Sequence, residues 1–307
     1  MEFPVLFLGA KPNNTPAFYN FMNHADFGMG TWYPKGGFNA VAKGMQKLAE
    51  ELGVQFLVNE KVVKIKTENN SVKSVVTETE TFEADIVISG ADYAHTETLL
   101  NTGEKNYSAD YWQKKTFAPS SFLYYVAFDR KIPHLQHHNL FFDTDFGQHA
   151  EEIYDTKTLP KKPLFYANFS SKTDPDLCPE GKEIGFFLIP VAVDLEDSKE
   201  IHDQYFELIM DRIEKNTGEN LRSAVIFKKS FGVNDFKERY HSCRGNAYGL
   251  ANTLLQTSVL RPSIDNKKIK NLFYTGQLTV PGPGVPPALI SGKVVTDYIL
   301  KNINRIL

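Results

Sequence analysis

The segment at residues 271–291, NLFYTGQLTVPGPGVPPALIS, constrains the fold more than any other part of the chain. Its apolar start predicts a short strand ending at Gly276, and its Gly/Pro run predicts a tight loop. Pro286 and Pro287 stand near the expected start of a helix, where a missing N–H sacrifices no hydrogen bond. Such a helix presents free N–H groups and its positive dipole end to the loop. The segment therefore predicts a site for an anion or an electron-rich carbonyl, although a plain turn into a terminal helix would explain the same residues.

Residues 36–91 predict a helix followed by several strands. Apolar residues recur at helical spacing over residues 38–52, and Gly53 then stops the helix. Asn69 and Asn70 indicate a turn between two strands. Strands are expected at residues 54–58, 62–66, 72–79 and 85–90, and the last is a continuous apolar run typical of a buried parallel strand. This order is typical of the second half of a dinucleotide-binding fold in which a β-meander replaces one crossover.

The middle of the chain, from about residue 106, has a different character. Aromatic-rich strands are separated by Pro, Asp, Gly and Lys clusters, and one long helix is expected at residues 198–216. The expected strands are residues 121–128, 139–142, 163–169, 183–190 and 224–231. The pattern predicts a mainly antiparallel α+β domain at residues 106–240, inserted into an α/β domain formed by residues 1–105 and 241–307.

Composition limits the classes of partner. The net charge of −3 offers no basic excess for a phosphate backbone, so nucleic acid is not an expected partner. The two cysteines form neither a disulfide framework nor a metal-ligand spacing, which fits a reducing, cytoplasmic compartment. The 23 Phe and 14 Tyr would suit a lipophilic substrate and would equally fill an ordinary core. No apolar run is long enough to span a bilayer, which leaves open peripheral contact at the inner face of the membrane.

The titratable residues suggest no catalytic constellation. No Ser-His-Asp order, paired carboxylates or metal-ligand spacing is found, so the catalytic residue is unknown and no metal is expected. His137 and His138 are predicted to form a solvated loop pair. His95 lies nearer the expected site, but capping or packing is its default role. Asp92 is predicted to cap a helix at residues 93–100.

Several segments together resemble the bacterial and fungal type of phytoene desaturases. Residues 271–293 resemble the C-terminal signature of that family, with Gln277 and Leu278 in place of a small pair and Val280 where His is frequent. The other matching segments, in the same order as in the family, are GTWYPKGG at residues 30–37, LG at 52–53 with NEKV at 59–62, ADIVISGAD at 84–92 and SCRGNAYGL at 242–250. Gly90 stands where Asn is usual.

The resemblance implies a glutathione-reductase-like, Rossmann-type FAD fold with an inserted substrate domain. It also implies FAD-dependent desaturation of a long polyene such as phytoene in carotenoid biosynthesis. The matched positions for the cofactor are Val62, Ser89, Gly90, Ala91, Gly276, Gln277, Gly284, Val285 and Pro286. The matched positions on the substrate side are Gly245, Ala247, Tyr248 and Gly249.

The phosphate-binding signature of such a fold, a strand followed by GxGxxG, is not found in this sequence. Gly28, Met29 and Gly30 are not in a strand-to-helix context. We therefore expect the pyrophosphate loop to lie in an N-terminal segment outside this chain, and expect the chain alone to bind FAD weakly or not at all. Two other interpretations stay open: another FAD-dependent oxidoreductase of the amine oxidase or retinol saturase-like type, and a non-catalytic lipid- or partner-binding fragment. The exact substrate, the electron acceptor and the oligomeric state are not fixed by the sequence.

Overall fold

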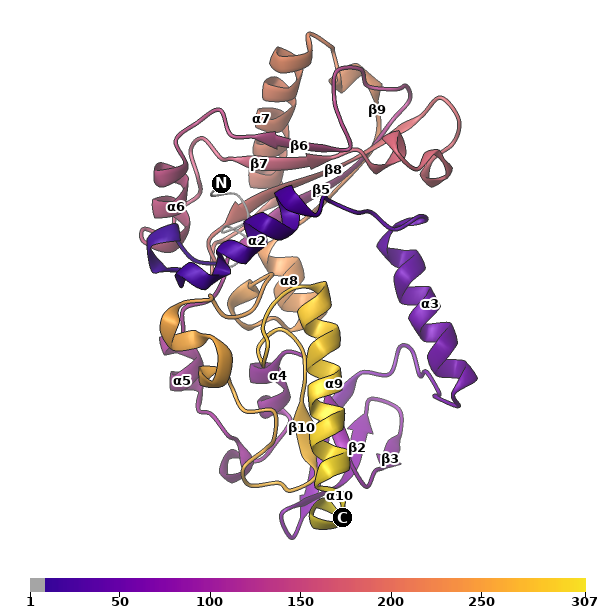
Figure 1. Ribbon diagram of the computed structural model, residues 1–307, viewed down its shortest axis with the longest axis vertical. Coiled ribbons are helices and arrows are strands. Elements are labelled where there is room, and N and C mark those ends of the chain that lie inside the picture. Colours follow the sequence, from indigo (N-terminus) through magenta and orange to yellow (C-terminus); the bar gives the residue numbers. More distant parts are fainter. Residues whose placement is uncertain (1–8) are drawn as a thin grey trace. The chain divides into compact units, whose positions relative to one another are not determined.

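The computed structural model describes residues 9–307, which divide into two compact units (Figure 1). Unit 1 contains the chain up to His24, Leu57–Ala118 and Phe236–Leu307, and unit 2 contains Ala25–Phe56 and Pro119–Asp235. The antiparallel region expected at residues 106–240 therefore corresponds to a shorter stretch of unit 2. Residues 25–56, expected with the first domain, group with unit 2 instead, because Gly36 donates its N–H to Asp174 Oδ2 at 2.6 Å and the Tyr33 ring packs on His137.

Unit 1 contains two small sheets. Strands β1 (Val62–Glu68), β2 (Ser71–Thr77) and β3 (Thr81–Glu83) form an antiparallel meander, and β4 (Val87–Ser89) pairs in parallel with β10 (Leu272–Tyr274). The predicted turn joins β1 to β2, and Asn69 and Asn70 both have positive φ there. The helices of this unit are α2 (Phe21–Asn23), α4 (Tyr93–Thr98), α5 (Ala109–Lys114), α9 (Val285–Lys301) and α10 (Ile303–Ile306), and α8 (Val233–Tyr240) crosses the boundary between the units.

Two strand predictions in unit 1 need correction. Residues 54–58 form no strand: they belong to none of the sheets found among residues 9–307, and they are exposed. The parallel pairing of residues 85–90 is confirmed, but the expected full burial is wrong: Ile88 is 46% exposed. In the part of the chain that the structure describes, β4 pairs with β10 alone, so this sheet is too narrow to bury β4 as a wide parallel sheet would.

Unit 2 is built on a five-stranded antiparallel sheet in the order β6-β7-β8-β5-β9, which confirms the aromatic strand prediction. Its strands are β5 (Ser120–Phe128), β6 (His138–Phe141), β7 (Phe165–Asn168), β8 (Glu183–Val191) and β9 (Val225–Phe231). Its helices are α3 (Gly37–Glu51), α6 (Phe146–Tyr154) and α7 (Lys199–Thr217).

The core of unit 2 lies between one face of this sheet and α7. Phe122, Tyr124 and Phe128 point from β5 into this core and are fully buried, as are Ile209 and Ile213 of α7. Because successive strand residues point to opposite faces, Leu123, Tyr125 and Ala127 lie on the other face of β5. Tyr125 is 45% exposed there, so this second face carries apolar surface that the core does not use.

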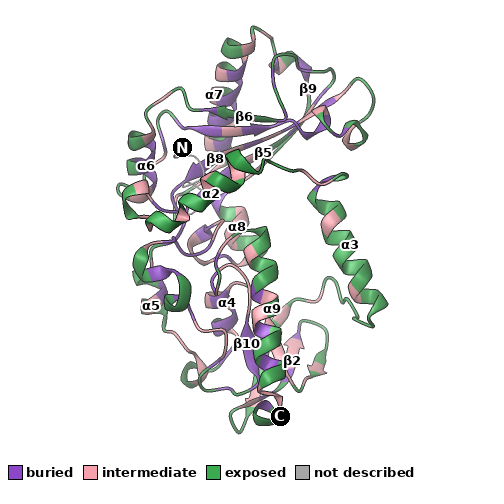
Figure 2. Cartoon of the chain, viewed as in Figure 1, coloured by how far each residue is buried: buried purple, intermediate pink, exposed green. Residues whose placement is uncertain are grey.

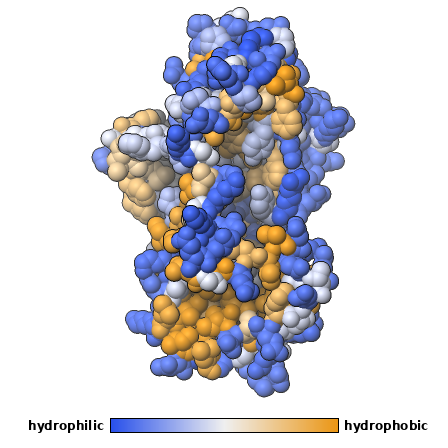
Figure 3. Space-filling model, turned by 90° about the vertical axis from the view of Figure 1, so that its right-hand side faces the viewer, coloured by the Kyte–Doolittle hydropathy of each residue, from blue (hydrophilic) through white to orange (hydrophobic). Residues whose placement is uncertain are grey.

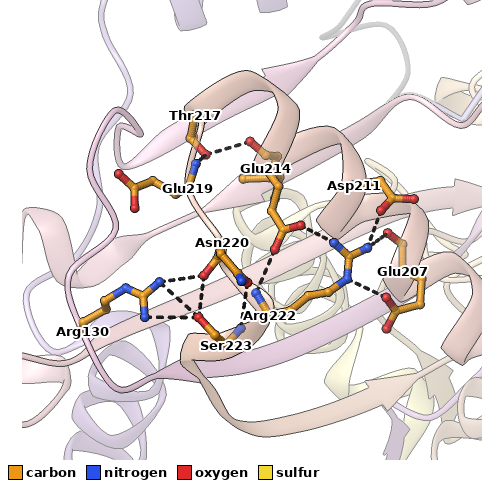
Figure 4. A network of polar contacts seen from close by, with 10 residues as sticks. Arg130, Glu207, Asp211, Glu214, Thr217, Glu219, Asn220, Arg222 and Ser223 are labelled. Carbon is orange, nitrogen blue, oxygen red and sulfur yellow. Dashed lines mark hydrogen bonds and ion pairs between the residues drawn. The ribbon is translucent and has the colours of Figure 1, made fainter.

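The end of α7 is fixed by a network of arginines and acids (Figure 4). Arg222 binds Glu207, Asp211 and Glu214 on successive turns of α7, and Gly218 ends the helix with φ +74. These acids raise the pKa of Arg222, with Glu207 the largest cause. The network holds the chain reversal between α7 and β9.

Helix α3 exposes almost its whole length (Figure 2). Its extent and the stop at Gly53, which has φ +89, are confirmed. Only Gly37 is buried, while Phe38, Met45 and Leu48 are about half exposed. Apolar side chains also reach the surface in other patches of the molecule (Figure 3).

Candidate functional site

A groove of about 560 Å³ in unit 1 opens where β4 and β10 end. Because the two strands run in parallel, their carboxyl ends lie at the same edge of the sheet. The loop after β4 supplies Gly90 and Ala91, and the loop after β10 supplies Gly276 and Gln277. The remaining lining residues are Asp92, Tyr93, Phe236, Tyr240, Ser242, Asn246, Ala247, Tyr248, Thr275, Leu278, Gly284, Val285 and Ala288.

The start of α9 faces this groove but offers fewer amides than the sequence predicts. Gly284 is the N-cap, with φ +116 and no side-chain cap, and the first intrahelical bond runs from Ala288 N to Gly284 O at 2.9 Å. Pro286 and Pro287 have no N–H, so Val285 alone supplies an amide donor among the first three helical positions. Gly284 and Val285 are both exposed. The helix start can therefore donate one hydrogen bond to a ligand, from the Val285 N–H, and its positive dipole end favours negative charge on that ligand.

The loop between β10 and α9, residues 275–284, is here called the Gly/Pro bend. It is hydrogen-bonded both to α9 and to the segment before β10. Ser291 of α9 accepts the Gly276 N–H at 2.9 Å, and its hydroxyl lies 2.7 Å from that of Thr275. Beneath the bend, the buried Arg261 donates to the Gln277 and Leu250 carbonyls, both at 3.2 Å. Burial lowers the pKa of Arg261 to about 10. The bend is thus positioned by buried polar contacts.

The return segment, residues 242–250, packs against the same bend. Gly249 has φ +84 and lies directly against Gln277, and its N–H binds Asn246 Oδ1 at 2.6 Å. Ala247 and Tyr248 line the groove, whereas Gly245 and Gly249 are buried behind it. This segment forms a second wall of the groove.

Asp92 connects the loop after β4 to the return segment. Its carboxylate accepts from His95 N at 3.2 Å, which confirms the predicted cap, and from Cys243 N at 3.0 Å. Burial raises the pKa of Asp92 although these backbone bonds oppose the shift. The His95 ring stacks on His241 at 4.0 Å, and burial lowers the pKa of His95. His95 does not line the groove, in keeping with the packing role expected for it.

The structure brings most of the predicted site residues together. Gly90, Ala91, Ala247, Tyr248, Gly276, Gln277, Gly284 and Val285 all line the groove. Five others do not. Of these, Ser89 instead binds the Thr96 hydroxyl at 2.6 Å, and Pro286, Gly245 and Gly249 lie outside the lining. Val62 also lies outside it, because it begins β1 in the separate meander.

Sequence reasoning missed Phe236 and Tyr240, which line the groove from α8. Their spacing of four residues places two aromatic side chains on one helical face. That spacing is the signal that could have revealed them.

A second cavity, of about 740 Å³, lies wholly within unit 2 and was not predicted. It is formed on the face of the sheet that the core leaves open, where the outward-facing residues of β5 are apolar. Its lining residues are Thr31, Trp32, Tyr33, Phe38, Tyr125, Val126, Ala127, His138, Tyr166, Asn168, Ser170, Ile184, Gly185, Phe186 and Phe227. The walls are therefore mainly aromatic and aliphatic. They include a few polar groups but no Asp, Glu, Lys or Arg side chain.

The expected solvated His pair is wrong for one of its members. His137 is buried and its Nδ1 lies 2.6 Å from Thr173 Oγ1. His138 is exposed and lines the cavity. The two rings stack at 4.1 Å, so the pair is part of a packed aromatic group.

Other kinds of site are not found in the part of the chain that the structure describes. No three His, Cys, Asp or Glu side chains gather there in a group that could hold a metal ion. Among residues 9–307, no helix combines the length and apolar character needed to cross a bilayer.

Comparison with known proteins points to one family. The family described as "Flavin containing amine oxidoreductase" matches residues 1–300. The chain is 40% identical over 304 residues to the "Carotenoid 3,4-desaturase" of Haloarcula japonica, covering 99% of this chain and 61% of that protein. It is 32% identical over 310 residues to the "zeta-carotene-forming phytoene desaturase" of Myxococcus xanthus, covering 98% of this chain and 58% of that protein. The chain thus spans about three fifths of the length of these relatives.

The fold also resembles that of solved structures. An oxidoreductase from Methanosarcina mazei superposes with a TM-score of 0.62 at 16% identity, covering 96% of this chain and 65% of that one. At this identity the likeness supports the fold alone. The overall fold is therefore shared with this oxidoreductase.

Proposed function

We propose that this chain, which belongs to the flavin containing amine oxidoreductase family, forms the cofactor-completing and substrate-binding part of an FAD-dependent desaturase of long polyenes. The observation that carries the proposal is the convergence of the loops after β4 and β10 with the start of α9 around one groove. The similarity to carotenoid desaturases over nearly the whole chain supports the same reaction class.

The groove suits a flat, electron-rich ring system. Gly90, Gly276 and Gly284 leave its walls without side chains, so a ligand can approach the backbone closely. The Val285 N–H and the α9 dipole favour a ring carbonyl or a developing negative charge. In this proposal unit 1 holds FAD, and Ala247 and Tyr248 contact its substrate-facing side. A bound flavin would supply the hydride acceptor, because desaturation takes a hydride and a proton from two adjacent C–H groups and leaves a C=C bond. The protein positions and shields the reacting groups.

The cavity in unit 2 favours a hydrocarbon over an amine as the substrate. None of its lining residues is Asp, Glu, Lys or Arg, whereas aromatic side chains dominate the walls. An ammonium group bound there would find no carboxylate among the lining residues to pair with its charge. Apolar walls instead favour a lipophilic polyene. We therefore place the desaturase proposal ahead of amine oxidation and of a non-catalytic lipid-binding role.

The test uses the protein expressed from its complete gene, purified and incubated with FAD. Bound flavin is followed by its visible absorbance, and a colourless C40 polyene is supplied in detergent or liposomes. We expect a red-shifted polyene product only when flavin is bound. Flavin binding with oxidation of amines and no change in any polyene would favour the amine oxidase interpretation. Polyene binding without flavin binding or turnover would favour the non-catalytic one.

A further inference from the structure

Another cavity, of about 580 Å³, lies within unit 1 and shares no lining residue with the groove at the start of α9. Its lining comes mainly from the loop before β10, the last turns of α9 and α10. The 17 residues of α9, at about 1.5 Å each, place the two ends of this helix about 25 Å apart. This cavity, called here the basic cavity, is therefore separate from the groove proposed to hold FAD.

Cationic side chains outnumber acids in the lining of the basic cavity. The cations are Lys267, Lys268, Lys270 and Arg305, whereas Asp265 is the one carboxylate among the described lining residues. Lys267 Nζ lies 2.8 Å from Asp265 Oδ1, so these two charges compensate each other. Lys268, Lys270 and Arg305 form no ion pair with an Asp or Glu side chain within residues 9–307.

The uncompensated charge favours an anion with more than one negative charge. Four cations and one carboxylate give the lining side chains a charge of +3, in a chain whose net charge is −3. The negative end of the α9 dipole offsets about half a unit charge of this excess. Lys268 Nζ donates to the Lys105 carbonyl at 2.8 Å, and Lys270 Nζ to the Leu307 main-chain oxygen at 3.5 Å. Because an ammonium group has three N–H donors, both lysines keep donors for a ligand.

Buried contacts fix the backbone that carries the lysines. Asn266 is 4% exposed, and its Oδ1 accepts the Lys268 N–H at 2.8 Å and the Ile269 N–H at 2.9 Å. The Lys270 N–H donates to the Asn70 carbonyl at 3.0 Å, which joins the loop to the turn between β1 and β2. A ligand bound by these lysines therefore has little backbone to order, which lowers the entropy cost of binding.

The basic cavity also has an apolar part. Phe273 of β10 and Ile306 of α10 line it and are almost fully buried. Tyr298 of α9 is 37% exposed in the same lining, and its ring packs edge-on against Phe273 with the centroids 6.1 Å apart. An inorganic ion would leave this apolar surface in contact with water, whereas an anion with an apolar substituent would cover it.

We propose that the basic cavity binds a phosphate ester that has an apolar substituent. Arg305 donates to the phosphate oxygens through its planar fork of N–H groups, Lys268 and Lys270 add point charges, and the Tyr298 ring contacts the substituent. A soluble alkyl phosphate and the head group of an anionic phospholipid share this chemistry. The site is independent of the flavin chemistry proposed for the groove at the start of α9.

The experiment measures the binding of hexyl phosphate and of inorganic phosphate to the protein expressed from its complete gene. Isothermal titration calorimetry at low ionic strength gives both Kd values under conditions where ion pairs are least screened. We expect hexyl phosphate to bind at least about fivefold more tightly, because its chain covers the apolar part of the cavity. Equal affinity for the two probes, or no binding of hexyl phosphate, would overturn the proposal.

Single-charge variants locate the binding. Arg305→Gln and Lys270→Gln are each expected to weaken hexyl phosphate binding about three- to tenfold, whereas Arg305→Lys should lose less because it keeps the charge. The matched control is Lys293→Gln, which removes the same charge from an exposed position of α9 outside the cavity and should keep the affinity within about twofold. Circular dichroism checks that each variant folds, and Lys268→Gln replaces any cavity variant that does not.

Vesicles distinguish the two sources of the phosphate ester. Phosphatidylcholine vesicles with and without phosphatidic acid are sedimented with the unaltered protein, with Arg305→Gln and with Lys293→Gln. Sedimentation that needs phosphatidic acid and weakens only in Arg305→Gln would support a phospholipid head group as the ligand. Hexyl phosphate binding that depends on Arg305, without such sedimentation, would support a soluble phosphate ester. Hexyl phosphate affinity that is unchanged in both Arg305→Gln and Lys270→Gln, or that falls equally in Lys293→Gln, would show that the basic cavity is not the binding site.

Discussion

Gly249 lies so close to Gln277 that a Cβ built at position 249 would stand 2.9 Å from the Gln277 carbonyl oxygen. The contact joins the return segment to the bend after β10, and it forms behind two residues of the groove wall, Ala247 and Tyr248. Gly249 also has φ +84, a conformation that side-chain-bearing residues adopt at a cost. The groove therefore depends on a glycine that does not itself line it.

The first prediction concerns this contact. Gly249→Ala is expected to lower the free energy of unfolding by about 1–3 kcal/mol, because the methyl group meets a backbone oxygen and the residue must keep a positive φ. Urea unfolding measures the change. Gly292→Ala, in α9 with no atom within 4 Å of its Cβ, is the control and should stabilise by about 0.5–1 kcal/mol. Equal effects of the two substitutions would contradict the packing described for Gly249.

The second prediction concerns Arg261. Replacing it by Ala leaves the Gln277 and Leu250 carbonyls and the Asn252 side chain without a donor. We expect a loss of about 2–4 kcal/mol of stability, because each of these acceptors lies in or near the buried interior. Thermal unfolding followed by circular dichroism measures it. Arg305→Ala, at an exposed position of α10, should change stability by less than about 0.5 kcal/mol; a similar loss in both variants would show that Arg261 does not hold the bend.

The local signals in the sequence predicted most of the secondary structure. Asn69 and Asn70 fixed the hairpin because both tolerate positive φ, and the aromatic alternation of β5 and β8 predicted the antiparallel sheet. Residues 54–58 misled, since an apolar run forms a strand only when another strand pairs with it. At the bend after β10, the sequence predicted the helix start that faces a ligand, but it overestimated the number of free N–H groups there.

The features that escaped prediction depend on contacts between distant segments. The burial of His137 requires Thr173 and Tyr33, which lie far from it along the chain. The unit 2 cavity requires β5, β7 and the loop at Trp32 to come together. The number of free amides at α9 could have been counted from the sequence, because Pro286 and Pro287 carry no N–H.

The third prediction tests the groove as a flavin site. Gly284→Ala places a Cβ 3.2 Å from Pro287 Cδ at φ +116, which strains the start of α9 beside the Val285 amide. In the protein expressed from the complete gene, we expect flavin affinity to fall about tenfold, with little change in stability of unit 2. Titration followed by flavin absorbance measures it. The control is again Gly292→Ala, and unchanged flavin affinity in Gly284→Ala would argue against a cofactor at this helix start.

The last prediction concerns the buried His149 of unit 2. Its Nδ1 accepts the Leu164 N–H at 3.1 Å, so its Nε2 carries the proton and donates to the Pro190 carbonyl at 3.0 Å. Both ring nitrogens are satisfied only when the ring is neutral, and burial lowers the pKa of His149 below its usual range. In the unfolded chain the pKa is about 6.5. The unfolded state therefore binds the proton first as the pH falls.

It follows that the stability from neutral His149 is fully present above about pH 6.5 and is lost as the pH falls from there through the lower pKa of the folded state. The slope is at most about 1.4 kcal/mol per pH unit for one proton. Urea unfolding at pH 7.5, 6.5 and 5.5 measures it. The pKa values of His95, His137 and His138 are lowered as well, so other histidines contribute to the slope. The contribution of His149 is therefore the difference in slope between the unaltered protein and His149→Gln. That variant should unfold more easily at pH 7.5 but lose less stability on acidification, whereas His134→Asn, at an exposed residue with φ +61 that Asn tolerates, should keep the parental slope. A parental slope in His149→Gln would show that this histidine does not carry the acid sensitivity.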